Sequence, residues 1–166
     1  MPEGQYVTAW QHFEQLPGVS KAIAALNHAE LRVLVVTNQR GIALGLYTAA
    51  DVEHIHRQLQ QQLAPHGAHI DGFYFCPHDK RECNCRKPLP GLFEQAQSDF
   101  PEINPATSVI IGDSLSDIEF GLNLKMQTIF IDGTENQKPG VEKARELSNH
   151  RFSTMPEAVE FLLESR

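Results

Sequence analysis

The sequence LRVLVVTNQ at residues 31–39 places an apolar run rich in β-branched residues directly before a hydroxyl and two amides. A short apolar run that ends in polar residues is typical of a buried strand. Three further stretches have this form: IDGFYF at 70–75, SVIIG at 108–112 and TIFID at 128–132. Segments of helical period lie between them, at 18–29, 49–64, 89–99, 115–124 and 141–148, and a last helix follows Thr154. This alternation predicts an α/β fold, with a parallel sheet flanked by helices.

The composition describes an ordinary acidic globular protein. The 166 residues include 14 basic and 21 acidic side chains, a formal net charge of −7, and 41% are hydrophobic. This length predicts one domain over residues 1–166. There is no basic run to bind a nucleic-acid backbone, no apolar run near the ~18 residues of a membrane span, and no secretion signal. We therefore expect a monomeric cytoplasmic protein that binds a small polar ligand, with no nucleic-acid or membrane partner.

All three cysteines of the chain lie in the segment CPHDKRECNC at residues 76–85, together with a histidine. Three thiolates and one imidazole suit the tetrahedral coordination of Zn²⁺, and four protein ligands leave no open position for a reacting water. Two alternatives are reduced cysteines beside a chance histidine, or a disulfide, although a Cys-x-Cys bridge is strained and rare in the cytosol. The segment predicts a structural zinc site with Cys76, His78, Cys83 and Cys85 as ligands.

Three polar segments are expected to meet at one edge of the sheet, because ligands of open parallel sheets bind beyond the carboxyl ends of the strands. They are 37–39, the loop 76–87 and 112–114. A threonine with successive backbone N–H groups can cradle a phosphate, although Thr-Asn-Gln is also common in turns. Zinc at Cys85 would also fix Arg86 and Lys87, which otherwise form a solvated basic pair.

The segment VIIGDSLSD at 109–117 runs from an apolar strand into two acidic residues, Asp113 and Asp117. Their spacing of four residues places both carboxylates on one face of the first helical turn, where they can hold Mg²⁺ through oxygen ligands. The alternative is that Asp113 only caps the helix.

Together these motifs resemble the haloacid dehalogenase superfamily of phosphohydrolases. The resemblance is to its zinc-containing branch, which holds the D,D-heptose 1,7-bisphosphate 7-phosphatases and the histidinol-phosphate phosphatases. It covers roughly the first 130 residues and rests on QYV at 5–7, LPGV at 16–19, VVTNQRGIALG at 35–45, DGFYFCPH at 71–78, CNCRKPLPG at 83–91 and IGDSLSD at 111–117. It implies a Rossmann-like fold and Mg²⁺-dependent hydrolysis of a phosphate monoester. Heptose 1,7-bisphosphate is the expected substrate, and histidinol phosphate is the alternative.

The resemblance also implies roles for individual residues. Thr37 would hydrogen-bond the transferring phosphoryl group, and Lys87 would neutralise charge on it. Asp113 would be a Mg²⁺ ligand, with Asp117 as a further ligand or an orienting residue. The cysteine and histidine quartet matches the zinc ligands of the family. The substrate pocket would be formed by Asn38, Gln39, Arg40, Arg86 and Ser114. Arg40 replaces a residue that is usually small in the family, so it either changes the charge of the substrate or points to solvent.

One motif of the family has no counterpart in residues 1–30. The family's nucleophile is an aspartate in an Asp-x-Asp motif that ends the first strand, which lies at the centre of the sheet between the strands ending at Thr37 and Gly112. We therefore expect a fold without this strand, an N-terminally truncated chain in which Met1 is an internal methionine, and no turnover by residues 1–166. The alternative is a non-catalytic, zinc-stapled protein that binds a phosphorylated ligand or a partner.

Overall fold

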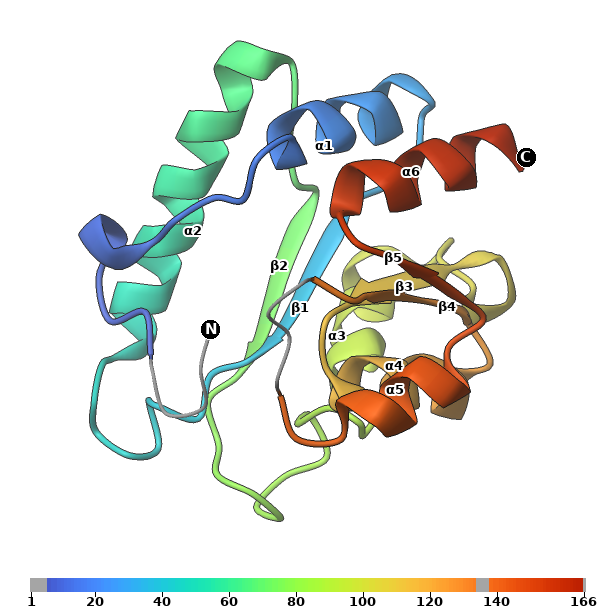
Figure 1. The fold of residues 1–166 in the computed structure, drawn as a ribbon. Coiled ribbons are helices and arrows are strands. Elements are labelled where there is room, and N and C mark those ends of the chain that lie inside the picture. Colours follow the sequence, from blue (N-terminus) through green and yellow to red (C-terminus); the bar gives the residue numbers. More distant parts are fainter. Residues whose placement is uncertain (1–5, 134–137, 166) are drawn as a thin grey trace.

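The computed structural model describes residues 6–133 and 138–165, so Met1 and Gln5 lie outside the described residues. Strands and helices alternate along the chain (Figure 1). None of the described helices combines the length and the apolar character needed to cross a membrane. In chain order the elements are η1 (Trp10–His12), α1 (Val19–His28), β1 (Leu34–Asn38), α2 (Ala49–Leu63), η2 (Ala64–His66), β2 (Gly72–Cys76), α3 (Gly91–Asp99), η3 (Pro105–Thr107), β3 (Val109–Gly112), α4 (Leu115–Leu124), β4 (Gln127–Ile131), α5 (Val141–Leu147), β5 (His150–Phe152) and α6 (Met155–Glu164).

The strands form two parallel groups with helices on both faces, which confirms the predicted α/β class. β1 pairs with β2, and β3, β4 and β5 pair in that order, all in parallel. Both groups contribute to the same hydrophobic clusters. Val33, which precedes β1, and Ile111 of β3 pack with α1 and α6 on one face. Val36 and Ile110 pack with α3 and α4 on the other.

The sheet is divided between β1 and β3, and Figure 1 shows the two groups of strands set apart. Within the described residues no strand lies between them, as expected for a fold without its central strand. Every residue of β1 and of β3 is half-buried, whereas β4, which pairs on both sides, buries Thr128, Ile129 and Phe130 completely. Backbone groups on the facing edges of β1 and β3 therefore lack the strand partners that a continuous sheet would give them.

The observed strands differ from the predicted ones at their ends. β1 begins at Leu34 rather than at Leu31, because the Leu31 N–H still bonds to Leu26 O in the last turn of α1 and the Val33 N–H bonds to the Asp71 carboxylate. The strand predicted at 70–75 is observed as β2, Gly72–Cys76. Asp71, the residue before this strand, is the one whose carboxylate accepts the Val33 N–H. β5 was not predicted, because a strand of only three residues, His150–Phe152, is defined by its pairing with β4 and is too short to show an apolar pattern.

Candidate active site

The carboxyl end of β1 is tied to the backbone of the cysteine-containing loop by one amide side chain. Asn38 Nδ2 donates to Lys87 O at 3.2 Å, and the Lys87 N–H donates back to Asn38 Oδ1 at 3.0 Å. Two reciprocal hydrogen bonds fix the backbone at Lys87 against the strand that carries Thr37. Two of the three predicted polar segments are therefore adjacent.

Lys87 brings the third segment into the same site. Its Nζ lies 2.6 Å from Asp117 Oδ1 and donates to Val36 O at 2.5 Å. The Lys87 side chain is 9% exposed and that of Asp117 is 10% exposed, so this is a buried ion pair. Burial by itself raises the pKa of Asp117, but the charge of Lys87 and hydrogen bonds from Ser114 outweigh burial and lower it. Through Lys87, Val36 O of β1 is thus connected to the Asp117 carboxylate of α4, the helix that follows β3.

The two acidic residues of the GDSLSD motif occupy different positions. Ser114 is the N-cap of α4 and forms a capping box with Asp117, so the alternative that Asp113 caps the helix is wrong. Asp113 lies one residue before the cap and not in the first turn as expected. Its side chain is 54% exposed and forms an ion pair with Lys138, a contact that no motif in the sequence indicated. Asp113 is thus accessible, whereas Asp117 is buried against Lys87.

Gly112 allows Asp117 to approach the end of β3. A Cβ at residue 112 would lie 2.3 Å from Asp117 Cβ, a distance that requires displacement. We therefore expect Gly112→Ala to lower the free energy of unfolding by about 1–3 kcal/mol, measured by urea denaturation. Gly133→Ala is the matched control, because a Cβ there meets nothing within 4 Å, and its effect should stay within about 0.5 kcal/mol. Equal effects of the two substitutions would contradict this account of Gly112.

The four predicted zinc ligands come together at the end of β2. Their donor atoms all lie within 4.8 Å of one another, and no other cluster of this kind is found in residues 6–133 and 138–165. The Cys76 and Cys83 sulfurs are 3.4 Å apart, Cys83 and Cys85 are 3.2 Å apart, and His78 Nδ1 is 3.3 Å from the Cys85 sulfur. All three cysteines are free thiols, so the disulfide alternative is not realised.

This cluster fits a zinc ion in donor set and in size. Tetrahedral Zn–S bonds of about 2.3 Å place sulfurs about 3.7 Å apart, so a small outward movement is enough to accommodate the ion. Burial raises the pKa of Cys76 and of Cys85. It acts in the same direction on Cys83, but hydrogen bonds with the other two thiols lower the pKa of Cys83 to about 7. Cys83 is therefore the thiol that most readily becomes a thiolate, the form that binds a metal.

The two arginines predicted to line the substrate pocket, Arg40 and Arg86, differ in their contacts. Arg40 Nε donates to Asp79 Oδ1 at 2.5 Å and its Nη2 donates to Oδ2 at 3.1 Å, and this bonding lowers the pKa of Asp79 to about 2. Arg40 thus binds the residue after His78 instead of pointing freely to solvent. Arg86 Nη1 is buried and has no hydrogen-bond partner in the part of the chain that the structure describes.

A buried tyrosine that the sequence did not indicate also reaches this site. Tyr47, from the loop between β1 and α2, donates its hydroxyl to Gln39 Oε1 at 2.6 Å, and Gln39 Nε2 donates to Thr37 Oγ1 at 3.1 Å. No motif contains Tyr47, and its spacing from Thr37 carries no periodicity. The only applicable rule is a general one, that the hydroxyl of a buried tyrosine usually forms a hydrogen bond.

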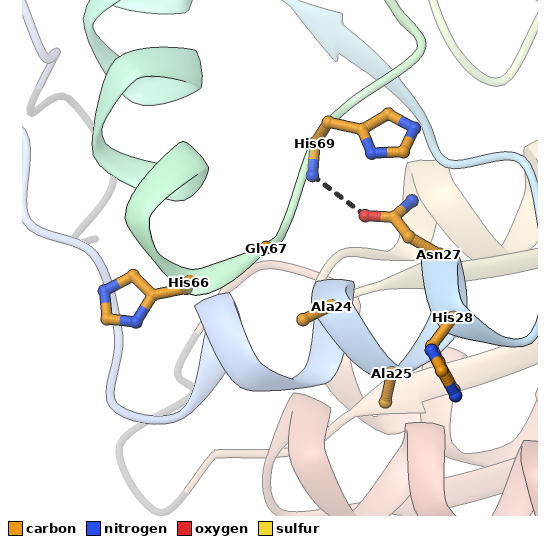
Figure 2. Close-up of a pocket in the computed structure, with 7 residues that line it drawn as sticks. All are labelled: Ala24, Ala25, Asn27, His28, His66, Gly67 and His69. Atoms are coloured by element: carbon orange, nitrogen blue, oxygen red, sulfur yellow. Dashed lines mark hydrogen bonds between the residues drawn. The ribbon is translucent and has the colours of Figure 1, made fainter.

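A shallow cavity beside α1 lies at the opposite, amino-terminal end of β1 and β2 (Figure 2). Figure 2 shows that the side chains of His28, His66 and His69 point in different directions and do not converge. The backbone N–H of His69 donates to Asn27 Oδ1 at 2.8 Å. The cavity lacks converging functional groups, so the carboxyl ends of β1 and β3 remain the candidate site.

The fold and the polar groups at its strand ends define a phosphohydrolase-like class of protein, and a family comparison agrees with this. The HAD-hydrolase-like family model matches residues 84–157. The chain is similar to the crystal structure of D,D-heptose 1,7-bisphosphate phosphatase from B. bronchiseptica in complex with magnesium and phosphate. The TM-score is 0.84 at 28% identity, over 97% of this chain and 90% of that one.

Two relatives indicate the family to which the chain belongs within this class. D-glycero-β-D-manno-heptose-1,7-bisphosphate 7-phosphatase of Escherichia coli O6:H1 is 31% identical over 163 residues, covering 93% of this chain and 85% of the relative. D-glycero-α-D-manno-heptose-1,7-bisphosphate 7-phosphatase of Mycobacterium tuberculosis CDC 1551 is 47% identical over 122 residues, 73% of this chain. This match spans 64% of the mycobacterial protein's length. The chain belongs to the family of the heptose-1,7-bisphosphate 7-phosphatases, within the haloacid dehalogenase-like hydrolases.

Proposed function

We propose that the carboxyl ends of β1 and β3 bind the phosphoryl group of a small phosphorylated sugar, and that heptose 1,7-bisphosphate is this sugar. The observation that carries the proposal is the position of the Lys87 ammonium, which lies at the end of the cysteine-containing loop. It is held between Val36 O and the Asp117 carboxylate. A fixed cation held at Val36 O, one residue before Thr37 in β1, is what transfer of a phosphoryl group requires, because the reaction depends on positioning and on charge neutralisation. The names of the relatives support the choice of sugar.

Each residue of the proposed site has its own role in binding the phosphoryl group. Thr37 donates a hydrogen bond to a phosphoryl oxygen, and Lys87 neutralises its charge while Asp117 positions Lys87. Asp113 is the accessible carboxylate to hold Mg²⁺, and Asp117, four residues later in the motif, is a further ligand or an orienting residue. When bound there, Mg²⁺ would supply further neutralisation of phosphate charge. The pocket that recognises the rest of the sugar phosphate is formed by Asn38, Gln39, Arg40, Arg86 and Ser114.

We also propose that residues 1–166 do not turn over this substrate by themselves. The two carboxylates at the strand ends, Asp113 and Asp117, are both paired with lysines. Neither is placed on a strand between β1 and β3, where the family carries its nucleophile. The division of the sheet equally favours the second candidate function, a non-catalytic protein that binds a phosphorylated ligand. In both cases we expect a single monomeric domain in the cytoplasm, which size-exclusion chromatography and cell fractionation test.

A turnover assay separates the two functions. With Mg²⁺ and heptose 1,7-bisphosphate, residues 1–166 should release no phosphate above background, and a variant extended at its N-terminus by an apolar strand ending in Asp-x-Asp should release it. The same extension with Asn-x-Asp is the matched control and should be inactive. Histidinol phosphate in the same assay tests the alternative substrate. Turnover by residues 1–166 that is abolished by Asp113→Ala would contradict the proposed inactivity. An extended variant that binds phosphate without turnover would favour the binding function.

A further inference from the structure

Three side chains form a hydrogen-bonded chain that ends at the proposed phosphate ligand. Tyr47 donates its hydroxyl to Gln39 Oε1 at 2.6 Å, and Gln39 Nε2 donates to Thr37 Oγ1 at 3.1 Å. We propose that Tyr47 is a positioning residue that, through Gln39, directs the Thr37 hydroxyl proton toward the bound phosphoryl group. This inference rests on the proposed function of Thr37.

The direction of each hydrogen bond follows from the groups present. A carboxamide has one end that only accepts and one end that only donates, so a donor at Oε1 turns the NH₂ group of Gln39 toward Thr37. Burial raises the pKa of Tyr47, against the opposing effect of the Gly41 backbone, so the phenol keeps the proton that it donates. The orientation of Gln39 is thus set by Tyr47.

The consequence appears at Thr37. A hydroxyl has one proton, and when its oxygen already accepts from Gln39 that proton is available to a different acceptor. Within residues 6–133 and 138–165, no hydrogen bond donated by the Thr37 hydroxyl is found. A phosphoryl group has strong acceptor oxygens, and a donor that is oriented in advance does not have to reorganise when the group binds.

The loop between β1 and α2 is shaped to admit the tyrosine ring. Tyr47 is 7% exposed, and a Cβ at Gly41 would lie 2.0 Å from its Cε1 atom. A side chain at residue 41 would therefore exclude the ring from this place. Phenylalanine at residue 47 keeps the ring and its packing but removes the donor. Gln39 can then rotate and present Oε1 to Thr37, which would direct the Thr37 proton away from the phosphate.

The test is a double-mutant cycle on phosphate affinity, with inorganic phosphate and Mg²⁺ as the probe in titration calorimetry. Tyr47→Phe should weaken binding about tenfold, as expected for loss of one hydrogen bond to a charged group. Thr37→Val should weaken it at least as much. In the Thr37→Val background, Tyr47→Phe should change the affinity less than twofold, because its effect passes through the missing hydroxyl. An equal further loss in that background, or no loss in the single variant, would overturn the proposal.

Two additional measurements keep this inference separate from the proposed function. Tyr74→Phe removes a tyrosine hydroxyl that donates to Asp99 at 2.8 Å, and it should leave phosphate affinity unchanged. In ¹⁵N-labelled protein without phosphate, Tyr47→Phe should shift the Gln39 side-chain amide signals. Unchanged signals would overturn the proposal that Tyr47 orients Gln39. If the unsubstituted protein binds no phosphate, the proposed function fails, and the amide signals still decide whether Tyr47 orients Gln39.

Discussion

Lys87→Met should lower the free energy of unfolding by about 3–5 kcal/mol, because it leaves a buried carboxylate without its counter-charge. Asp117 is held by Lys87 on one oxygen and by Ser114 on the other, and its side chain is only 10% exposed. Val36 O also loses its donor. Methionine keeps most of the volume of the side chain, so the loss reports the charge rather than a cavity. Urea denaturation at neutral pH measures the effect.

Two further variants make this prediction specific. Lys143→Met removes an ion pair with Glu119 in which the lysine side chain is 58% exposed. This substitution should lower the free energy of unfolding by no more than about 1 kcal/mol. Adding Asp117→Asn to Lys87→Met should restore part of the lost stability, because the buried charge is then absent. A loss at Lys87 no larger than the loss at Lys143 would show that the pair does not connect the two halves of the sheet.

Removing zinc should have the second large effect. We expect about one equivalent of zinc in carefully purified protein, and a stability loss of about 4 kcal/mol on chelation when free zinc had been a thousandfold above its dissociation constant. The reason is that Cys76 and Cys85 lie in one hydrophobic cluster with Leu92 and Ala96 of α3, so the metal would tie the loop to the core. Metal analysis and thermal unfolding with and without chelator measure both quantities.

The zinc prediction has its own control. His78→Ala removes a ligand and should reproduce the effect of chelation, whereas His54→Ala changes an exposed residue of α2 and should not. Because Lys87 follows Cys85 by two residues, loss of zinc should also weaken phosphate binding. Less than half an equivalent of zinc, or full stability of His78→Ala, would contradict a structural metal site.

The residues that the sequence predicted correctly are those whose role depends on neighbours close in the chain. The alternation of apolar runs and helical segments indicated four of the five strands and the six helices, because burial and backbone hydrogen bonding follow local periodicity. The cysteine and histidine quartet lies within ten residues, so its convergence required only a loop. The start of the last helix after Thr154 was also predicted correctly, because its N-cap contact reaches only three residues along the chain, to the Glu157 N–H.

Tertiary structure alone decided which distant groups meet. Lys87 and Asp117 are 30 residues apart and Asp113 and Lys138 are 25 apart, so no periodicity relates them. The sequence predicted that the strand ends converge, but which carboxylate is buried depends on how α4 packs and on the absence of a side chain at Gly112. The start of β1 likewise depends on the Asp71 carboxylate, which binds the Val33 N–H from another segment. Local pattern determined the elements and the residue types of the site, whereas side-chain reach across the fold determined the pairs.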